Sequence, residues 1–120
     1  MKWSIDKDRA ICPQIEDQIC AAISLGILKP GERLKSVREV AVEAGVNPPP
    51  VPKAVSEMDR DGLIYSRPGS GWYVGEEKTV ADEQLKRLVR EKTAQFLKEM
   101  KTLGMDKQQI IRLLEEESDE

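Results

Sequence analysis

The stretch from residue 36 to residue 64 constrains the fold of this 120-residue chain more than any other part. Ser36 stands three residues before Glu39 and just ahead of an apolar run, the pattern of a capping box at the start of a helix. Gly45 then allows a tight turn, and Gly62 ends a second periodic run. The side chains expected to face inward are Val37, Val40, Ala41, Val51, Ala54, Val55 and Met58. The spacing therefore predicts two short helices joined by a tight turn.

Two runs with the composition of β-strands follow. Residues 63–67 and 72–74 are rich in β-branched and aromatic side chains, and the sequence Pro68-Gly69-Ser70-Gly71 between them is typical of a hairpin turn. A further helix is expected ahead of this unit, from about Pro13 to Gly26. The order predicts a helix-turn-helix followed by a hairpin wing, an arrangement that fits a DNA groove.

The chain changes character after Gly75, where a charged run begins. A long amphipathic helix from about Val80 and a shorter one capped by Asp106 are expected, with Gly104 between them. Isolated helices of this length are marginal in water, so their apolar stripe needs a covering surface. A second copy of the chain is the economical partner, and packing against the chain's own N-terminal part is the alternative. The residues expected at the dimer contact are Leu85, Leu88, Val89, Phe96, Met100 and Leu103.

The predicted fold class is mainly α (α+β). A winged helix-turn-helix DNA-binding domain is expected in residues 1–75, and a helical dimerisation segment with an acidic tail in residues 76–120. The first part carries equal numbers of basic and acidic residues, ten of each, whereas the second carries nine against twelve. Between Lys29 and Lys53 five basic residues face three acidic ones, so a mildly basic face is expected there.

The sequence lacks the residue patterns that enzymes and metal-binding proteins usually require. The chain has no histidine, its two cysteines lie eight positions apart in one expected helix, and its carboxylates lie on solvated faces. That cysteine spacing corresponds to about 12 Å along a helix, too far for a disulfide. No enzymatic activity, cofactor or metal is therefore expected. No apolar run approaches the length of a membrane span and no secretory signal is visible, so a cytoplasmic protein is expected.

The ordered motifs resemble the winged helix-turn-helix domain of GntR-family bacterial transcription regulators, over about residues 3–75. The motifs that carry the resemblance are Leu28-Lys29-Pro30-Gly31-Glu32-Arg33-Leu34, Ser36-Val37-Arg38-Glu39-Val40-Ala41, Gly45-Val46-Asn47-Pro48, Asp61-Gly62-Leu63-Ile64 and Gly69-Ser70-Gly71. The short helical C-terminal segment looks like that of the YtrA-type subfamily. The resemblance implies a homodimeric repressor that binds a pseudo-palindromic operator in double-stranded DNA, often beside genes for membrane transporters. It implies no particular effector ligand.

The resemblance also implies which residues reach DNA. Arg38 matches the second-helix arginine that contacts DNA in the family, Asn47 the polar residue before the recognition helix, and Gly69 the wing-tip glycine near the minor groove. The full set of expected DNA contacts is Lys35, Ser36, Arg38, Asn47, Lys53, Arg67 and Gly69. The alternatives stay open: Arg38 could pair with Glu39 or Glu43, and Lys53 and Arg67 could be ordinary solvated cations.

The run Asn47-Pro48-Pro49-Pro50-Val51-Pro52 departs from the family pattern, which has polar residues at positions 49 and 50. If Asn47 caps the helix, Pro52 lies in its interior and lacks the N–H that would bond the carbonyl of residue 48. A proline at such a position destabilises a helix by about 3 kcal/mol. The sequence therefore predicts an irregular start to this helix, near Val51 or Pro52. The alternative function is a winged-helix interaction or dimerisation module whose DNA binding is weakened by Pro49, Pro50 and Pro52.

Overall fold

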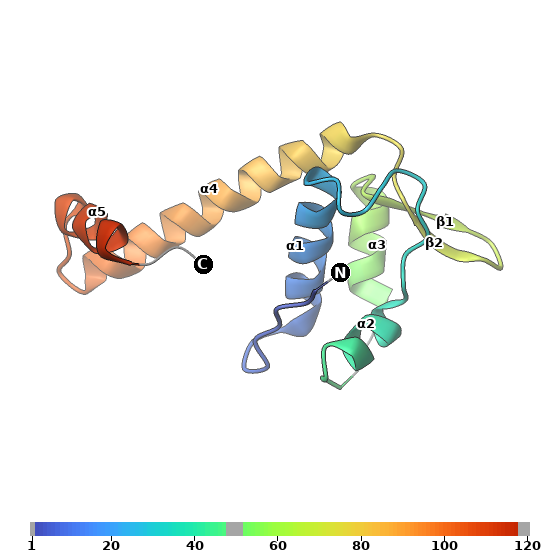
Figure 1. Cartoon of the computed structure of the whole chain (residues 1–120), viewed down its shortest axis with the longest axis horizontal. Helices are drawn as coiled ribbons and strands as arrows, with labels where there is room; N and C mark the ends of the chain where they lie inside the picture. The colour runs from blue at the N-terminus through green and yellow to red at the C-terminus, as the bar shows by residue number, and fades with distance from the viewer. Residues whose placement is uncertain (1, 48–51, 118–120) are drawn as a thin grey trace. The chain divides into compact units, whose positions relative to one another are not determined.

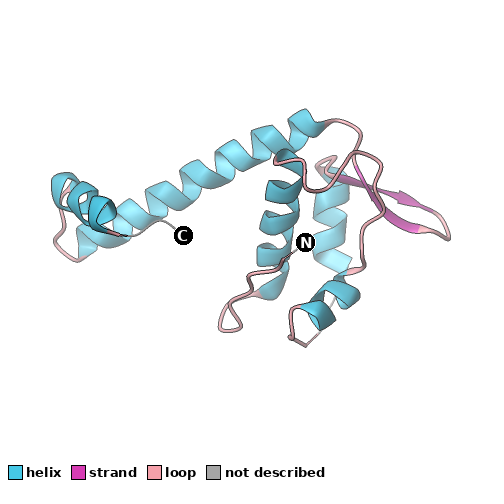
Figure 2. Ribbon diagram, viewed as in Figure 1, coloured by secondary structure: helices cyan, strands magenta, loops and turns pink. Residues whose placement is uncertain are grey.

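The computed structural model describes residues 2–47 and 52–117, with the backbone alone for residues 37 and 52–54. It is mainly helical with one small antiparallel sheet, as the sequence predicts (Figure 2). The elements in chain order are α1 (Ile11–Ser24), α2 (Val37–Glu43), α3 (Pro52–Arg60), β1 (Ile64–Arg67), β2 (Gly71–Val74), α4 (Lys78–Thr102) and α5 (Lys107–Glu116) (Figure 1). The chain divides into two compact units, Met1–Lys86 and Arg87–Glu120, and α4 belongs to both.

The core of the first unit is built around α1, which packs against α3. Its buried residues recur at three- and four-residue steps because one face of an amphipathic helix repeats at that interval. The buried core consists of Ile15, Ile19, Cys20, Ile23, Leu34, Val40, Val55, Met58, Leu63, Ile64, Val74 and Ala81. The helix begins at Ile11, two residues before the predicted start. Pro13 then lies within the first turn, where its missing N–H has no helical partner to lose.

The short helix α2 begins as predicted with a complete capping box. The Ser36 hydroxyl accepts from the Glu39 amide, and the Glu39 carboxylate accepts from the Ser36 amide, both at 3.1 Å. Val40 and Ala41 are buried, while the predicted burial of Val37 lies outside the described side chains. The turn after α2 closes with a hydrogen bond from the Val46 amide to the Ala41 carbonyl at 3.0 Å.

The wing is the antiparallel hairpin of β1 and β2, in which Ile64 pairs with Val74 and Arg67 with Gly71. Residues 31–34 lie along the free edge of β2. The Leu34 amide donates to the Trp72 carbonyl at 2.8 Å, and the Val74 amide donates to the carbonyl of Glu32 at 2.9 Å. This extended segment therefore lies beside the two-stranded sheet and is joined to it by the bridge between Arg33 and Tyr73.

The segment before α1 is held along the helix by two glutamine side chains. Gln18 accepts from the Ser4 amide at 2.9 Å and donates to the Ser4 carbonyl at 2.7 Å. Gln14 binds the amide and carbonyl of Asp6 in the same way, at 2.7 and 2.9 Å. These four bonds keep Trp3 packed against the core.

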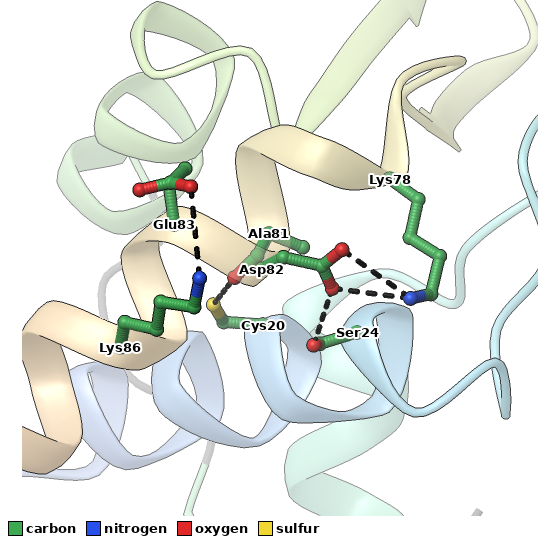
Figure 3. A network of polar contacts seen from close by, with 7 residues as sticks. All are labelled: Cys20, Ser24, Lys78, Ala81, Asp82, Glu83 and Lys86. Atoms are coloured by element: carbon green, nitrogen blue, oxygen red, sulfur yellow. Dashed lines mark hydrogen bonds and ion pairs between the residues drawn. The ribbon is translucent and has the colours of Figure 1, made fainter.

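The start of α4 is anchored to α1 by a polar network (Figure 3). The Cys20 thiol donates to the Ala81 carbonyl at 3.4 Å, and the Ser24 hydroxyl donates to Asp82 at 2.6 Å. The Ser24 bond and then Lys78 hold the pKa of the Asp82 carboxyl group below its usual range. α4 begins at Lys78, two residues before the expected start, and the Asp82 carboxylate accepts from Ser24 of α1.

The second unit contains the C-terminal part of α4 and the whole of α5. Asp106 caps α5 through a second complete capping box with Gln109, as the sequence predicts. Ile110 is buried within this unit. The other large apolar side chains of α5 remain exposed in the single chain: Ile111, Leu113 and Leu114.

Candidate nucleic-acid interface

The second helix of the predicted DNA-binding unit carries an exposed cation that pairs with no carboxylate among the described residues. Arg38 lies on the first turn of α2 and is exposed. Within the described residues it makes no ion pair, because Glu39 is held in the capping box and Glu43 pairs with Lys35. The pairing that was the alternative for Arg38 is therefore not formed.

Lys35 and Ser36, the two expected DNA contacts before α2, already have partners. The ion pair with Glu43 raises the pKa of Lys35 and lowers that of Glu43. Ser36 spends its hydroxyl oxygen on the cap. Both residues are exposed beside Arg38, so a phosphate could still reach the lysine if the surface pair with Glu43 opens.

The start of the recognition helix lies only partly within the described residues. Asn47 is exposed at the end of the turn, and α3 is described from Pro52 to Arg60. Lys53 lies on the first described turn. The predicted irregular path falls on residues 48–51, which lie outside the described part of the chain.

The wing tip presents backbone and one stacked cation. Gly69 is exposed with φ of +75° in the turn closed by the Ser70 amide and the Arg67 carbonyl at 2.9 Å. The Arg67 guanidinium lies 4.4 Å from the ring centre of Tyr73 and donates to the Tyr65 hydroxyl at 3.3 Å. Arg67 is therefore held in place rather than freely solvated, which was the alternative for it.

Arg33 belongs to the same region although it was not among the expected site residues. Its Nε donates to the Ser70 carbonyl at 3.1 Å, across 37 positions of sequence. The sequence signal was present only as one of five basic residues between Lys29 and Lys53. Its contact with the tip depends on the pairing of residues 31–34 with β2, which single-sequence patterns do not reveal.

An acidic contact lies behind the helix-turn-helix, between α1 and α3. Burial, followed by the charges of Glu57 and neighbouring acids, raises the pKa of Glu16 to about 7. Its Oε1 atom is buried and has no hydrogen-bond partner among the described residues. Burial, followed by Glu16, also raises the pKa of the half-buried Cys12 thiol.

A cavity of about 150 Å³ opens on the first unit, between the N-terminal segment, α1, α2 and residues 32–35. Its walls are Trp3, Ile19, Leu28, Leu34 and Val40, with Glu32, Arg33, Lys35 and Glu43 also lining it. Arg33 and Lys35 thus border both the cavity and the elements that carry the expected DNA contacts.

The residues expected at the dimer contact fall into two groups. Leu85 is half-buried and packs against the core of its own first unit, the alternative considered for the stripe. Farther along α4, Val89 and Phe96 are 54% and 40% exposed, and Leu103, in the turn directly after the helix, is 75% exposed. Leu88 and Met100 are half-buried.

Two classes of site were sought in the described ranges 2–47 and 52–117. No helix there has both the length and the apolar character of a membrane span. No cluster of three or more cysteine, aspartate or glutamate side chains is placed to hold a metal ion in the same ranges.

Comparison with known proteins finds a matching family and relatives that cover most of the chain. Residues 13–74 match the family described as bacterial regulatory proteins, gntR family. The HTH-type transcriptional regulator YhcF of Bacillus subtilis (strain 168) is 39% identical over 111 residues, 92% of this chain and 92% of YhcF. The HTH-type transcriptional repressor YtrA of the same organism is 33% identical over 107 residues, 88% of this chain and 82% of YtrA.

A solved structure agrees with these relatives. A GntR family transcriptional regulator from Listeria monocytogenes superposes with a TM-score of 0.74 at 31% identity, over 95% of this chain and all of that one. The resemblance found in the sequence is thus confirmed, and the relatives are transcription regulators rather than enzymes. From the winged helix-turn-helix, the matched residues and these relatives together, the chain belongs to the gntR family of bacterial regulatory proteins.

Proposed function

We propose that this chain is a cytoplasmic, homodimeric repressor that binds a pseudo-palindromic operator and controls a neighbouring operon of the transporter type. The observation that carries the proposal is Arg38 on α2, which is exposed and makes no ion pair within the described residues, in the same unit as the wing tip at Gly69. A guanidinium group with unused donors suits a phosphate or a base edge. The remaining proposed DNA contacts are Lys35, Ser36, Asn47, Lys53 and Arg67.

The second unit supports dimerisation. Its helices expose large apolar side chains, which in a single chain would face water. Pairing two copies through this surface would present two recognition helices about 34 Å apart, one helical turn of DNA. The proposed contact residues are Leu88, Val89, Phe96, Met100 and Leu103, together with Leu85 in the part of α4 that belongs to the first unit.

The repressor role rests on similarity to YtrA, which carries that description and matches this chain over most of its length. Deletion of the gene should raise the transcripts of the adjacent operon, and restoring the gene should lower them again. An Arg38→Gln copy of the gene should fail to restore repression. Unchanged transcripts in the deletion strain would contradict the proposed target.

DNA binding is tested with a duplex that contains the region upstream of the chain's own gene. Fluorescence anisotropy from about 50 to 200 mM salt should show tight binding that weakens linearly on a log–log plot, because phosphate contacts release counterions. A shuffled duplex of the same composition is the control. Equal affinity for both duplexes would contradict operator recognition.

The alternative function keeps the dimer and gives up the operator. Pro52 is the first described residue of α3 and lacks a backbone donor, and Pro49 and Pro50 stand where the family has polar residues. A protein that sediments as a dimer but does not distinguish the two duplexes at low salt would be this interaction module. Substituting threonine at positions 49 and 50 should then restore selective binding.

A further inference from the structure

We propose that Arg33 fixes the tip of the wing and that its guanidinium also contacts one phosphate of the bound DNA. The inference rests on the proposed DNA binding and assigns a DNA phosphate as the partner of Arg33, a residue that was not among the expected DNA contacts. Its test separates the two, because the effect of Arg33 on the wing is measured without DNA.

The backbone brings Arg33 to the wing. Residue 33 forms an antiparallel bridge with Tyr73, and the Leu34 amide donates to the Trp72 carbonyl at 2.8 Å. Bridge partners in antiparallel pairs place their side chains on the same face of a sheet. Arg33 and Tyr73 therefore share one face of the wing, although they are 40 positions apart in sequence.

The side chain of Arg33 then grips the tip. Its Nε donates to the Ser70 carbonyl at 3.1 Å, and a Cβ atom added at Gly71 would lie 3.5 Å from its Nη2. The planar guanidinium thus lies against the backbone of the loop, at a distance of ordinary van der Waals contact from position 71. Ser70 in turn shares a hydrogen bond with the Tyr73 hydroxyl. The tip is held between Arg33 and Tyr73.

A second guanidinium lies on this face. Arg67 stacks 4.4 Å from the ring centre of Tyr73, whose ring is 5.8 Å from that of Tyr65. Neither Arg33 nor Arg67 makes an ion pair with a carboxylate in the described ranges. Glu76 on this side accepts instead from the Tyr65 hydroxyl, at 3.3 Å.

Two anchored cations lie around one tyrosine, and neither is paired with a carboxylate in the part of the chain that the structure describes, so this face suits a polyanion. An arginine has five N–H donors, and the described contacts of Arg33 use one of them. The remaining donors form a planar fork that matches phosphate oxygens. Because the fork is fixed to the tip backbone, it would position the wing on the duplex rather than read a base.

The experiment compares three variants. Arg33→Gln removes the charge, Arg33→Lys keeps the charge but removes the fork, and Arg9→Gln removes an exposed arginine outside the wing as the matched control. Urea unfolding midpoints first establish that each variant is folded. Affinity for the upstream duplex is then measured across salt concentrations, and amide hydrogen exchange of Ser70 and Gly71 is measured by NMR without DNA.

Arg33→Gln should lower the slope of log affinity against log salt by about 0.9 per wing, and weaken binding by about tenfold per wing. Arg33→Lys should keep the slope. Both should speed exchange of the tip amides several-fold, while Arg9→Gln should match the parent protein in every measurement.

Each half of the proposal has its own failure. A parent-like salt slope in Arg33→Gln overturns the phosphate contact, and parent-like exchange in both Arg33 variants overturns the grip on the tip. If the parent protein binds no duplex selectively, the proposed function fails and the phosphate contact with it. The exchange data still decide whether Arg33 fixes the wing.

Discussion

Glu16 places a carboxyl group at the contact between α1 and α3, where burial and then Glu57 raise its pKa to about 7 from an ordinary 4.5. The folded chain therefore holds this proton more tightly than the unfolded chain does. The resulting stabilisation is fully present below about pH 4.5 and is lost as the pH rises through about 7. At neutral pH and above, the ionised carboxylate opposes the packing of the recognition helix.

Replacing this carboxyl group should remove that pH dependence. At about pH 8 the free energy of unfolding of Glu16→Gln should exceed that of the parent by on the order of 1 kcal/mol after solvent screening, measured by urea unfolding. Near pH 4.5 the variant and the parent should be about equally stable. Asp59→Asn, which changes an exposed acid on α3, is the control. If Glu16→Gln follows the same pH profile as the parent between these values, the carboxyl group does not titrate as described.

Gly69 at the wing tip has a backbone conformation that disfavours other residues. Its φ is +75°, and no other atom lies within 4 Å of a Cβ added there, so Gly69→Ala introduces backbone strain without a clash. We expect a loss of about 1 kcal/mol in the free energy of unfolding, together with weaker operator binding. Gly104→Ala is the matched control, because Gly104 has φ of +84° and equally open surroundings in the second unit.

Equal stability losses in these two variants, with weaker DNA binding in Gly69→Ala alone, would support the placement of the wing tip on DNA. Equal DNA binding in both variants would contradict it. Urea unfolding and fluorescence anisotropy provide the two measurements.

At the level of elements, the sequence predicts those structures whose signals are local. The capping boxes at Ser36 and Asp106 mark the starts of α2 and α5 because donor and acceptor lie three residues apart. The hairpin at residues 68–71 follows from its turn residues. The start of α1 was misplaced by two residues, because a proline is tolerated at several positions of a first turn.

Interactions between distant segments could not be predicted in this way. The contact of Arg33 with Ser70 and the approach of Glu16 to Glu57 depend on how elements pack, which the sequence pattern does not specify. The docking of residues 2–9 by Gln14 and Gln18 is similar, because a polar side chain on a helix usually faces water.

The capping box of α2 gives a test at this scale. Ser36→Ala should lower the free energy of unfolding by about 1 kcal/mol, because the Glu39 amide loses its acceptor. Ser36→Asn keeps a capping oxygen and should recover most of that loss. Urea unfolding measures both. Should Ser36→Asn be as unstable as Ser36→Ala, the hydroxyl would have a role other than capping.

At the scale of the whole molecule, the proposed dimer makes operator affinity depend on the second unit. The double variant Phe96→Gln, Leu103→Gln replaces two exposed apolar side chains and should sediment as a monomer. Its affinity for the operator should fall by roughly 100-fold or more, because two half-sites no longer bind as one. Analytical ultracentrifugation and anisotropy measure these effects.

Lys98→Gln changes an exposed residue of α4 between Phe96 and Leu103 and is the control for the dimer test. It should sediment and bind as the parent does. A parent protein that already sediments as a monomer at working concentrations would overturn the dimer and the paired-helix geometry that depends on it.

The thiol of Cys20 lies buried between α1 and α4 and donates to the Ala81 carbonyl. Because Cys20 is buried against Ala81, separation of the first turns of α4 from α1 would expose its sulfur to an alkylating reagent. The rate at which Cys20 is modified therefore reports how often α4 separates from α1, and the measurement needs no introduced label. If operator DNA lowers the alkylation rate of Cys20, duplex binding stabilises the contact between α1 and the start of α4, which lies outside the proposed DNA-binding surface.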